Sequence, residues 1–355
     1  MMPSTRTFTF GREVMLMVVF GALVLGMPQW LTWIGGYEAL ATKVLIWALF
    51  ALGFDILLGF TAYLSFGHAA FFGTSAYVTG LMLKHVSASV IPAMLAAVTV
   101  NLALALLLGA LILRRSGIYF SILSLAFAEM LHAAGLSIFA KWTGGDNGLT
   151  MDTKPVLLGI PMEGRPVFFL CAVFVILGFA VARQIKRSPM GLMLQAIKEN
   201  PTRLEYSGVN VMAYKFAAYV ISAVYAGVAG SLMVIYEPYV ATKFLHWSTS
   251  GELVVMSVIG GVNTLLGPML GAGFMLYFEN VVQSVIGEQW KLVLGLIFVC
   301  IVIFLPGGFM DLWRRLRALL GRAKSRRDNV PDAPGSIQEA REANYAALAN
   351  MEEAS

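Results

Sequence analysis

The sequence predicts an all-α, polytopic integral membrane protein with about ten transmembrane helices, some of them broken or re-entrant. Three observations predict this fold class. Hydrophobic residues make up 58% of the 355 residues and charged residues only 13%, whereas soluble chains average roughly 25% charged residues. The mean hydropathy is +0.76. Hydrophobic runs of about 20 residues, the length at which a helix spans a bilayer, recur along nearly the whole chain.

The hydrophobic runs give the expected membrane spans in order. They cover residues 13–34, 39–60, 66–84, 90–113, 118–140, 166–184, 211–236, 250–263, 264–286 and 289–306. The first run is not expected to be a cleavable signal peptide, because no short polar stretch with a small-residue cleavage site separates it from the next run. We therefore predict a transmembrane domain over residues 13–308, preceded by a cytoplasmic N-terminal segment, residues 1–12.

The distribution of Lys and Arg predicts the orientation of the chain. These residues concentrate in cytoplasmic loops of membrane proteins. If the N-terminus lies inside, 18 of the 25 Lys and Arg residues fall on the inner side and 7 on the outer side. This division predicts that both termini are cytoplasmic and that the number of spans is even. The net charge of +5 thus reflects topology, and no aromatic-interleaved basic patch indicates a nucleic-acid partner.

Two glycine-rich runs predict non-helical backbone at membrane depth. They are GFTAYLSFGHAAFFG at residues 59–73 and IGGVNTLLGPMLGAG at residues 259–273. Such backbone is tolerated only where protein or a water-filled cavity satisfies its polar groups, and paired broken segments often line a transport path. A tight re-entrant turn without substrate contact is the alternative.

Polar residues at membrane depth are the candidates for such a path. An ionised side chain at the centre of a membrane helix costs roughly 2.5–3.5 kcal/mol on insertion scales, so it is not expected to face lipid unpaired. The candidates for the translocation path are Asp55, Ser65, His68, Glu129 and Asn263. For each, a hydrogen-bonded position inside the bundle is the alternative. A proton relay through Asp55, Glu129 and His132 would suit a secondary transporter, because Glu129 and His132 lie three residues apart on one helix.

Catalytic motifs are absent from the sequence. It has no Gly-Lys dipeptide and hence no P-loop, and it has no HExxH or GxSxG motif. Cys171 and Cys300 both lie in hydrophobic runs, so neither a disulfide framework nor a metal site is expected. We predict no catalytic residue, no metal and no cofactor, and we disfavour a membrane enzyme.

Three segments outside the spans are expected to form an outer loop, an interfacial helix and a C-terminal tail. Residues 141–165 form a turn-rich loop of about 25 residues with mixed charge, expected on the periplasmic side as a connector or a docking element. Residues 309–322 carry an apolar stripe at helical spacing among arginines, which predicts an amphipathic interfacial helix on the inner leaflet of the lipid bilayer. Residues 323–355 are rich in Pro, Gly, Asp, Glu and Ala, which predicts a disordered cytoplasmic tail.

Residues 183–210 predict a compact helical hairpin on the cytoplasmic face. The segment is basic and interrupts an otherwise lipid-soluble sequence. Ser188-Pro189 has the form of an N-cap followed by Pro at the first helical position, and Asn200-Pro201 repeats it. Gly208 stands where a C-terminal cap is expected. Such a hairpin is typically presented to a soluble partner.

Six separate blocks of sequence carry a family resemblance. They are TAYLSFGHAAFFGTSAY (61–77), RRSGIYFSILSLAFAEM (114–130), TGGDNGL (143–149), SPMGLMLQAIKENPTRLEYSGVN (188–210), SGELVVMSVIGGVNTLLGPMLGA (250–272) and LPGGFMDL (305–312). With these blocks, over about residues 35–312, the chain resembles the membrane permease subunits of bacterial ABC importers for branched-chain amino acids, on the side of the second permease of the pair. Permeases for urea and short-chain amides are relatives that these blocks do not separate.

The resemblance implies a function and a set of partners. It implies translocation of branched-chain or related hydrophobic amino acids across the bacterial inner membrane, driven by ATP hydrolysis on separate subunits. The implied partners are a second permease subunit forming a heterodimer, two ABC ATPase subunits and a periplasmic substrate-binding protein. A urea or short-chain amide permease and a proton-coupled secondary amino-acid transporter are the alternatives.

The resemblance also implies a role for the hairpin. In such importers a short cytoplasmic helix inserts into a groove of the ATPase and transmits its closure to the permease. By position this would be residues 196–208, and the implied coupling residues are Ala196, Ile197, Glu199, Asn200, Leu204 and Gly208. Ile197 and Leu204 would be the apolar side chains that enter the groove. A hairpin lying on the lipid surface is the alternative.

Overall fold

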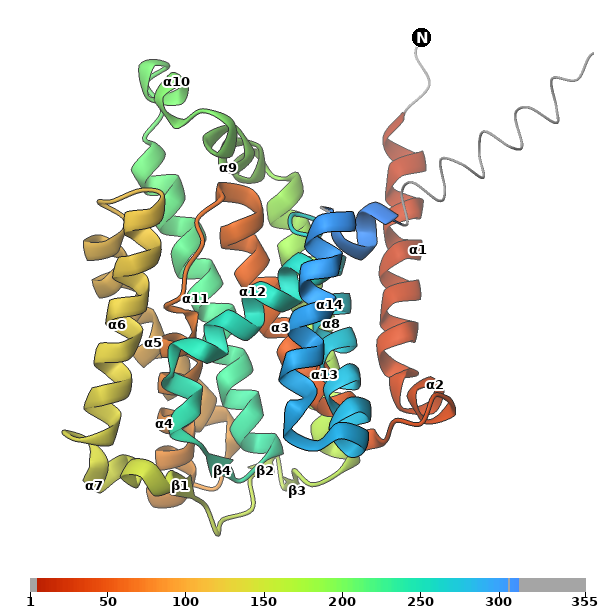
Figure 1. The fold of residues 1–355 in the computed structure, drawn as a ribbon, viewed down its shortest axis with the longest axis vertical. Coiled ribbons are helices and arrows are strands. Elements are labelled where there is room, and N and C mark those ends of the chain that lie inside the picture. The colour runs from red at the N-terminus through yellow and green to blue at the C-terminus, as the bar shows by residue number, and fades with distance from the viewer. Residues whose placement is uncertain (1–4, 306, 313–355) are drawn as a thin grey trace, which may run out of the picture. The chain divides into compact units, whose positions relative to one another are not determined.

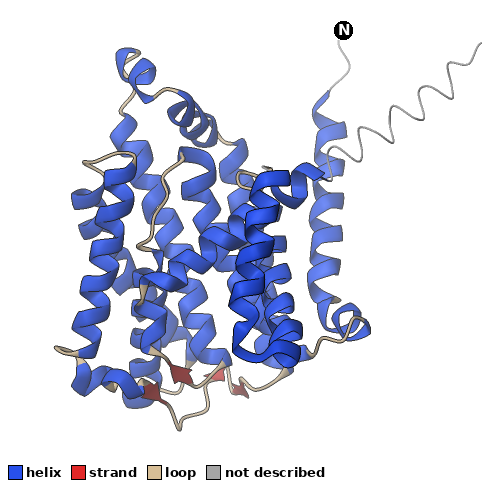
Figure 2. Cartoon of the chain, in the orientation of Figure 1, coloured by secondary structure: helices blue, strands red, loops and turns tan. Residues whose placement is uncertain are grey.

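A computed structural model describes residues 5–305 and 307–312 of the chain. Residues up to Asp311 belong to one compact unit, Met1–Asp311. Helices make up most of its described part, and the strands are short and lie together at one end (Figure 2). We call this the strand end, and we call the opposite end, which carries α9 and α10, the hairpin end (Figure 1).

The elements follow one another with few irregular stretches. The helices of the first half are α1 (Thr5–Leu25), α2 (Met27–Trp33), α3 (Glu38–Thr61), α4 (His68–His85), α5 (Val90–Ile112), α6 (Ile118–Leu136) and α7 (Ala140–Thr143). Those of the second half are α8 (Arg165–Arg187), α9 (Pro189–Glu199), α10 (Pro201–Tyr206), α11 (Val211–Tyr236), α12 (Trp247–Gly260), α13 (Leu266–Ile286) and α14 (Trp290–Phe304). The short elements are β1 (Leu149–Thr150), β2 (Val156–Leu157), β3 (Ile160–Pro161), β4 (Tyr239–Val240) and the 3-10 turns η1 (Gly145–Asn147), η2 (Thr242–Leu245) and η3 (Gly287–Gln289).

The predicted polytopic, all-α membrane fold is confirmed, but the count of ten spans is not. Within the described residues, α3, α5, α6, α8 and α11 are each long and apolar enough to cross a membrane. The α1–α2 pair, bent by 58°, makes a sixth candidate. The expected span at 250–263 corresponds to α12, whose 14 residues rise about 21 Å, less than the roughly 30 Å hydrocarbon core of a bilayer.

The core of the unit is built around α3 and α11. In the apolar window of α3, 94% of residues are buried inside the unit, and in that of α11 the share is 78%. Apolar side chains lie on every face of α3, which is typical of a helix that faces neither solvent nor lipid. Small residues of α11 allow close packing, as at Gly230, where an added Cβ would overlap the backbone of Phe72.

The two halves of the unit run in opposite directions. α3 runs toward the hairpin end and is followed by an extended segment and α4, α5 and α6 (Figure 1). α11 runs toward the strand end and is likewise followed by a non-helical segment, then α12, α13 and α14. Inverted halves of this kind place their interrupted helices in the middle of the bundle.

Each of the two predicted runs contains a short stretch of non-helical backbone. Residues 62–67 are non-helical, as predicted for the run 59–73, and Ala62 has a φ of 59°. The run 259–273 contains a tight turn at 261–265 between α12 and α13. The interruption at 237–246, between α11 and α12, was not predicted, because this segment carries no glycine to mark it.

The C-terminal expectations fall almost entirely outside the described residues. Residues 308–312 are helical, which covers the start of the predicted interfacial helix at 309–322. The remainder of that helix and the predicted tail at 323–355 lie beyond the part of the chain that the structure describes.

Candidate functional site

The hairpin at 188–208 has the local structure that its sequence predicts. The Ser188 hydroxyl accepts a hydrogen bond from the Gly191 amide at 3.4 Å and caps α9. The Asn200 side chain accepts one from the Arg203 amide at 3.0 Å and caps α10. Gly208 has a φ of 80°, the left-handed conformation that favours glycine at a helix C-terminus. The predicted capping is therefore confirmed.

One residue of the hairpin, Ile197, faces inward, whereas the sequence predicted that it would face outward. Leu194 and Ile197 point into the body of this chain, and Ile197 is only 2% exposed. Leu204 is half-buried against the same core. Ile197 is thus not free to enter a groove of another protein, because its i, i+3 spacing from Leu194 places both on the inward face of α9. Two outward apolar side chains, which the sequence reasoning missed, are Tyr206, 89% exposed, and Leu192, 63% exposed.

Two lysines join the hairpin end to the transmembrane helices. Lys198 of α9 donates a hydrogen bond to the carbonyl of Gly59, in the last turn of α3, at 3.0 Å. Lys186, near the end of α8, donates to the carbonyl of Asn263, in the turn between α12 and α13. Charged donors make the stronger class of hydrogen bond. The two contacts therefore hold α3 and the α12–α13 turn against the hairpin and α8.

Asp55 organises the same turn from inside the bundle. Its side chain is fully buried, and its two carboxylate oxygens accept hydrogen bonds from the amides of Asn263 (2.7 Å) and Leu265 (3.1 Å). Asn263 and Leu265 both have positive φ. The backbone amides of these two residues therefore find their hydrogen-bond partner outside the turn, in Asp55. An added Cβ at Gly59 would overlap Asp55 and Asn263. We call Lys198, Gly59, Asp55, the turn 261–265 and Lys186 the inner network.

The interrupted segment before α4 is held by hydroxyl groups from two other helices. From α6, Ser124 accepts from the Phe66 amide at 3.0 Å, and Ser121 donates to the Leu64 carbonyl at 2.6 Å. From α12, Ser250 accepts from the Ala69 amide at 2.7 Å. These bonds satisfy backbone groups that no helix satisfies, which is the condition for non-helical backbone in a membrane.

Ser65 and His68, two predicted path residues, are fully buried at this interruption. The Ser65 hydroxyl accepts from the Gly67 amide at 3.2 Å. His68 Nε2 lies 2.7 Å from the hydroxyl of Ser222, which donates to the Gly53 carbonyl. Because that hydroxyl has one hydrogen, His68 Nε2 is the donor. Both residues therefore stabilise the packed interruption in this conformation.

Glu129, another predicted path residue, lies in α6 with part of its side chain exposed. It contacts His132, as its i, i+3 spacing predicts, with 3.7 Å between Glu129 Oε2 and His132 Nδ1. It also contacts His246, with 3.7 Å between Glu129 Oε1 and His246 Nε2. Asp55 lies in the half of α3 near the hairpin end, whereas Glu129 and His132 lie in the half of α6 near the strand end (Figure 1). The relay expected for a secondary transporter is thus not assembled.

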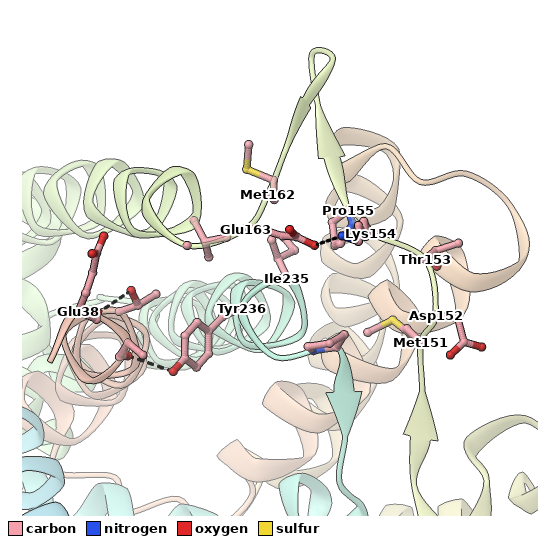
Figure 3. A pocket seen from close by; sticks show the side chains of 15 residues that line it. Glu38, Met151, Asp152, Thr153, Lys154, Pro155, Met162, Glu163, Ile235 and Tyr236 are labelled. Atoms are coloured by element: carbon pink, nitrogen blue, oxygen red, sulfur yellow. Dashed lines mark hydrogen bonds and ion pairs between the residues drawn. The ribbon is translucent and has the colours of Figure 1, made fainter.

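At the strand end, the loop 141–165 surrounds a pocket of about 580 Å³ (Figure 3). The start of α3, the start of α8 and the end of α11 complete its walls. Ion pairs lie around it, Lys154 with Glu163 at 2.9 Å and Arg165 with Glu38 at 3.4 Å. Beyond the pocket, the β2–β3 hairpin projects Leu158, 84% exposed, and Ile160, 56% exposed.

Together, these observations define a class of protein. Membrane-length helices, two interruptions between consecutive helices and a capped hairpin at one end are the features of a polytopic membrane transport protein. Residues 36–302 match the family described as branched-chain amino acid transport system / permease component. The match covers more than half of the chain, and the chain belongs to this family.

Curated relatives agree with the family. The chain is 26% identical over 314 residues to the high-affinity branched-chain amino acid transport system permease protein LivM of Salmonella typhimurium, covering 81% of this chain and 73% of that protein. The LivM of Escherichia coli is 25% identical with the same coverage. The nucleoside ABC transporter permease protein NupC of Lactococcus lactis is 29% identical over 38% of this chain and 43% of that protein. No solved structure matches the chain.

Membership of the family settles the general role of the chain. It is a permease subunit of an ABC importer and a multi-pass protein of the bacterial inner membrane. It is a transport subunit and not an enzyme, and it works with ATPase and substrate-binding components.

Proposed function

We propose that branched-chain amino acids are the cargo of this permease. The observation that carries the proposal is the extent of the similarity to LivM, which covers 81% of this chain. The similarity to the nucleoside permease covers 38%. A shared helix bundle accounts for a partial match, whereas the LivM match extends over most of the chain. The family match over residues 36–302 includes the outer loop and both interruptions.

Uptake of labelled amino acids tests the cargo. The chain is produced with its own partner subunits in a bacterial strain that lacks branched-chain importers. Leucine, isoleucine and valine are expected to enter in an ATP-dependent manner, and guanosine, urea and acetamide are not. Uptake of guanosine or of an amide with no uptake of leucine would refute the proposed cargo while leaving the permease role intact.

We propose further that the chain pairs with a second, different permease subunit and that the pair binds two ATPase subunits. The six sequence blocks that carry the family resemblance support the assignment as the second permease of such a pair.

The hairpin end is proposed to face the cytoplasm and the strand end the periplasm. The start of α1, the hairpin and the end of α14 lie at the same end of the unit (Figure 1), as the predicted orientation requires. The basic residues of 183–203 lie there as well. Positive charge of this density is typical of a cytoplasmic face.

Within this orientation the hairpin is proposed to dock on the ATPase. Tyr206 is the outward apolar side chain on α10 and makes the contact; exposed Glu199 and Asn200 adjoin it along the hairpin, and Ile197 anchors the hairpin from inside. Ala196, Leu204 and Gly208 belong to the part of the hairpin that enters the groove of the ATPase. Movement of the hairpin is transmitted to the helix bundle through the hydrogen bond between Lys198 and Gly59, which connects the hairpin to α3.

The inner network is proposed to transmit this movement to α12 and α13. Lys186 and Asp55 both bind the turn 261–265, one at the Asn263 carbonyl and one at its amide. A shift of α3 relative to α8 therefore acts on the turn from two sides. At the strand end, the tip formed by Leu158 and Ile160 is proposed to contact the periplasmic substrate-binding protein.

A further inference from the structure

We infer that Glu129, His132 and His246 form a binding site for a first-row divalent transition-metal ion such as Zn²⁺. Glu129 and His132 lie one turn apart on α6, and His246 directly precedes α12. One ligand atom from each residue lies within 4.8 Å of the other two. Among the described residues, this is the group of metal-ligating side chains that the fold brings together.

The donor set suits the proposed ion. Two imidazole nitrogens and one carboxylate oxygen are the ligands of many zinc sites, at bond lengths of about 2.0–2.2 Å. Tetrahedral coordination at these lengths separates neighbouring ligands by about 3.4 Å. The carboxylate oxygens of Glu129 lie 3.7 Å from His132 Nδ1 and 3.7 Å from His246 Nε2. These two contacts use different oxygens of Glu129, and the three ligand atoms lie within 4.8 Å of one another, so coordination through one oxygen requires the side chains to close by up to about 1.4 Å.

The surroundings of the trio favour a cation. The His246 Nδ1 atom lies 2.8 Å from the hydroxyl of Ser248. Nδ1 also accepts a hydrogen bond from the Ser248 amide at 3.3 Å, so metal binding at Nε2 requires the proton to move to Nδ1, which then donates to the Ser248 hydroxyl. The neighbouring Lys243 is paired with Glu252 at 3.1 Å, which offsets its positive charge. With neutral imidazoles, the carboxylate of Glu129 gives the trio a net negative charge.

The trio is also accessible to an ion from solution. The side chains of His132, His246 and Glu129 are 19%, 33% and 36% exposed. A fourth coordination position is therefore open to water. The amide of Trp247 donates to Glu129 at 3.2 Å, so the carboxylate is already held beside the start of α12. A bound ion would clamp α6 to α12, and it would slow any step of transport that separates these two helices.

Cobalt binding tests the site directly. Co²⁺ is titrated into the purified full-length chain in complex with its partner subunits, and the visible absorption of the bound ion is followed, with displacement by Zn²⁺. Glu129→Gln, His132→Asn and His246→Asn are each expected to weaken binding at least tenfold. His85→Asn is the matched control, because His85 is exposed at the end of α4 and outside the trio. Unchanged affinity in the three trio variants would overturn the inference.

A second variant covers the case in which a ligand is also needed for folding. His246→Cys keeps a metal ligand at the same position, and a thiolate favours softer ions. This variant is expected to bind Cd²⁺ at least tenfold more tightly than the wild type does. A folded complex carrying His246→Cys without that gain in Cd²⁺ affinity would refute the site. Both measurements read metal binding, so they are independent of the cargo that the complex transports.

Discussion

At the scale of single residues, Asp55 illustrates how a membrane helix accommodates a carboxylate. Its side chain is fully buried, and each oxygen accepts a hydrogen bond from a backbone amide of the turn 261–265. Burial of a charge is costly unless the charge is hydrogen-bonded. Asp55 thus secures a turn with positive φ values, and this explains its position better than the lining of a path does.

Asp55→Asn is expected to destabilise the protein by about 1–3 kcal/mol, because the amide group can accept from only one of the two backbone donors and leaves the other unpaired. The measurement is thermal unfolding of the purified chain, together with uptake by the complex. Asp152→Asn, which changes an exposed carboxylate in the outer loop, is the control and is expected to unfold like the wild type. Equal stability of Asp55→Asn and wild type would contradict this account of the turn.

Ile197→Asp is expected to prevent stable packing of α9. Ile197 is 2% exposed, so the substitution places an unpaired carboxylate in an apolar interior, at a cost of several kcal/mol. Ile197→Val should cost only about 0.5–1.5 kcal/mol. Limited proteolysis of the hairpin measures the effect. Leu192→Asp, on the exposed side of the same helix, should leave the cleavage rate unchanged; rapid cleavage in that variant alone would reverse the assignment of the two faces.

At the scale of elements, two projecting structures mark opposite ends of the unit. The α9–α10 hairpin projects Tyr206 at one end and the β2–β3 hairpin projects Leu158 at the other. The two side chains are almost equally exposed, at 89% and 84%. They therefore form a matched pair for testing which partner binds each end.

Tyr206→Asp is expected to reduce co-purification of the ATPase at least tenfold and to leave capture of the substrate-binding protein unchanged. Leu158→Asp is expected to give the opposite pair of results. The reason is the same in both cases, since a charge placed in an apolar contact loses hydration without gaining a partner. Each variant serves as the control for the other. Loss of ATPase binding in Leu158→Asp, with none in Tyr206→Asp, would exchange the two proposed faces.

At the scale of the whole molecule, the inverted halves carry the interruptions 62–67 and 237–246, of which the first begins at the hairpin end and the second at the strand end. Groups from other elements hold each interruption in place. Hydroxyls of α6 bind the first, and a hydroxyl of α12 binds the start of α4 that follows it. The backbone of β1 in the outer loop pairs with that of β4 in the second. The outer loop is therefore part of the fold of the bundle as well as the proposed contact with the binding protein.

The proposed orientation of the molecule predicts the accessibility of introduced cysteines. In a background without Cys171 and Cys300, Leu158→Cys should react with a membrane-impermeant thiol reagent added to the periplasmic side of intact cells. Tyr206→Cys should react only after the membrane is opened. Both positions are highly exposed, so a difference between them reports sidedness and not burial. Reaction of Tyr206→Cys alone in intact cells would invert the topology.

The sequence by itself determined the features that depend on local composition and spacing. Long apolar runs predict membrane helices because the bilayer sets their length, and Ser188 and Asn200 predict helix starts because a cap acts within three residues. Tertiary structure alone decided which groups meet across long separations. In the folded chain Ile197 faces inward, and Asp55 accepts hydrogen bonds from the amides of residues 263 and 265. His246 lies beside Glu129 and His132. Such contacts depend on how whole helices pack, and no local pattern in a single sequence encodes that packing.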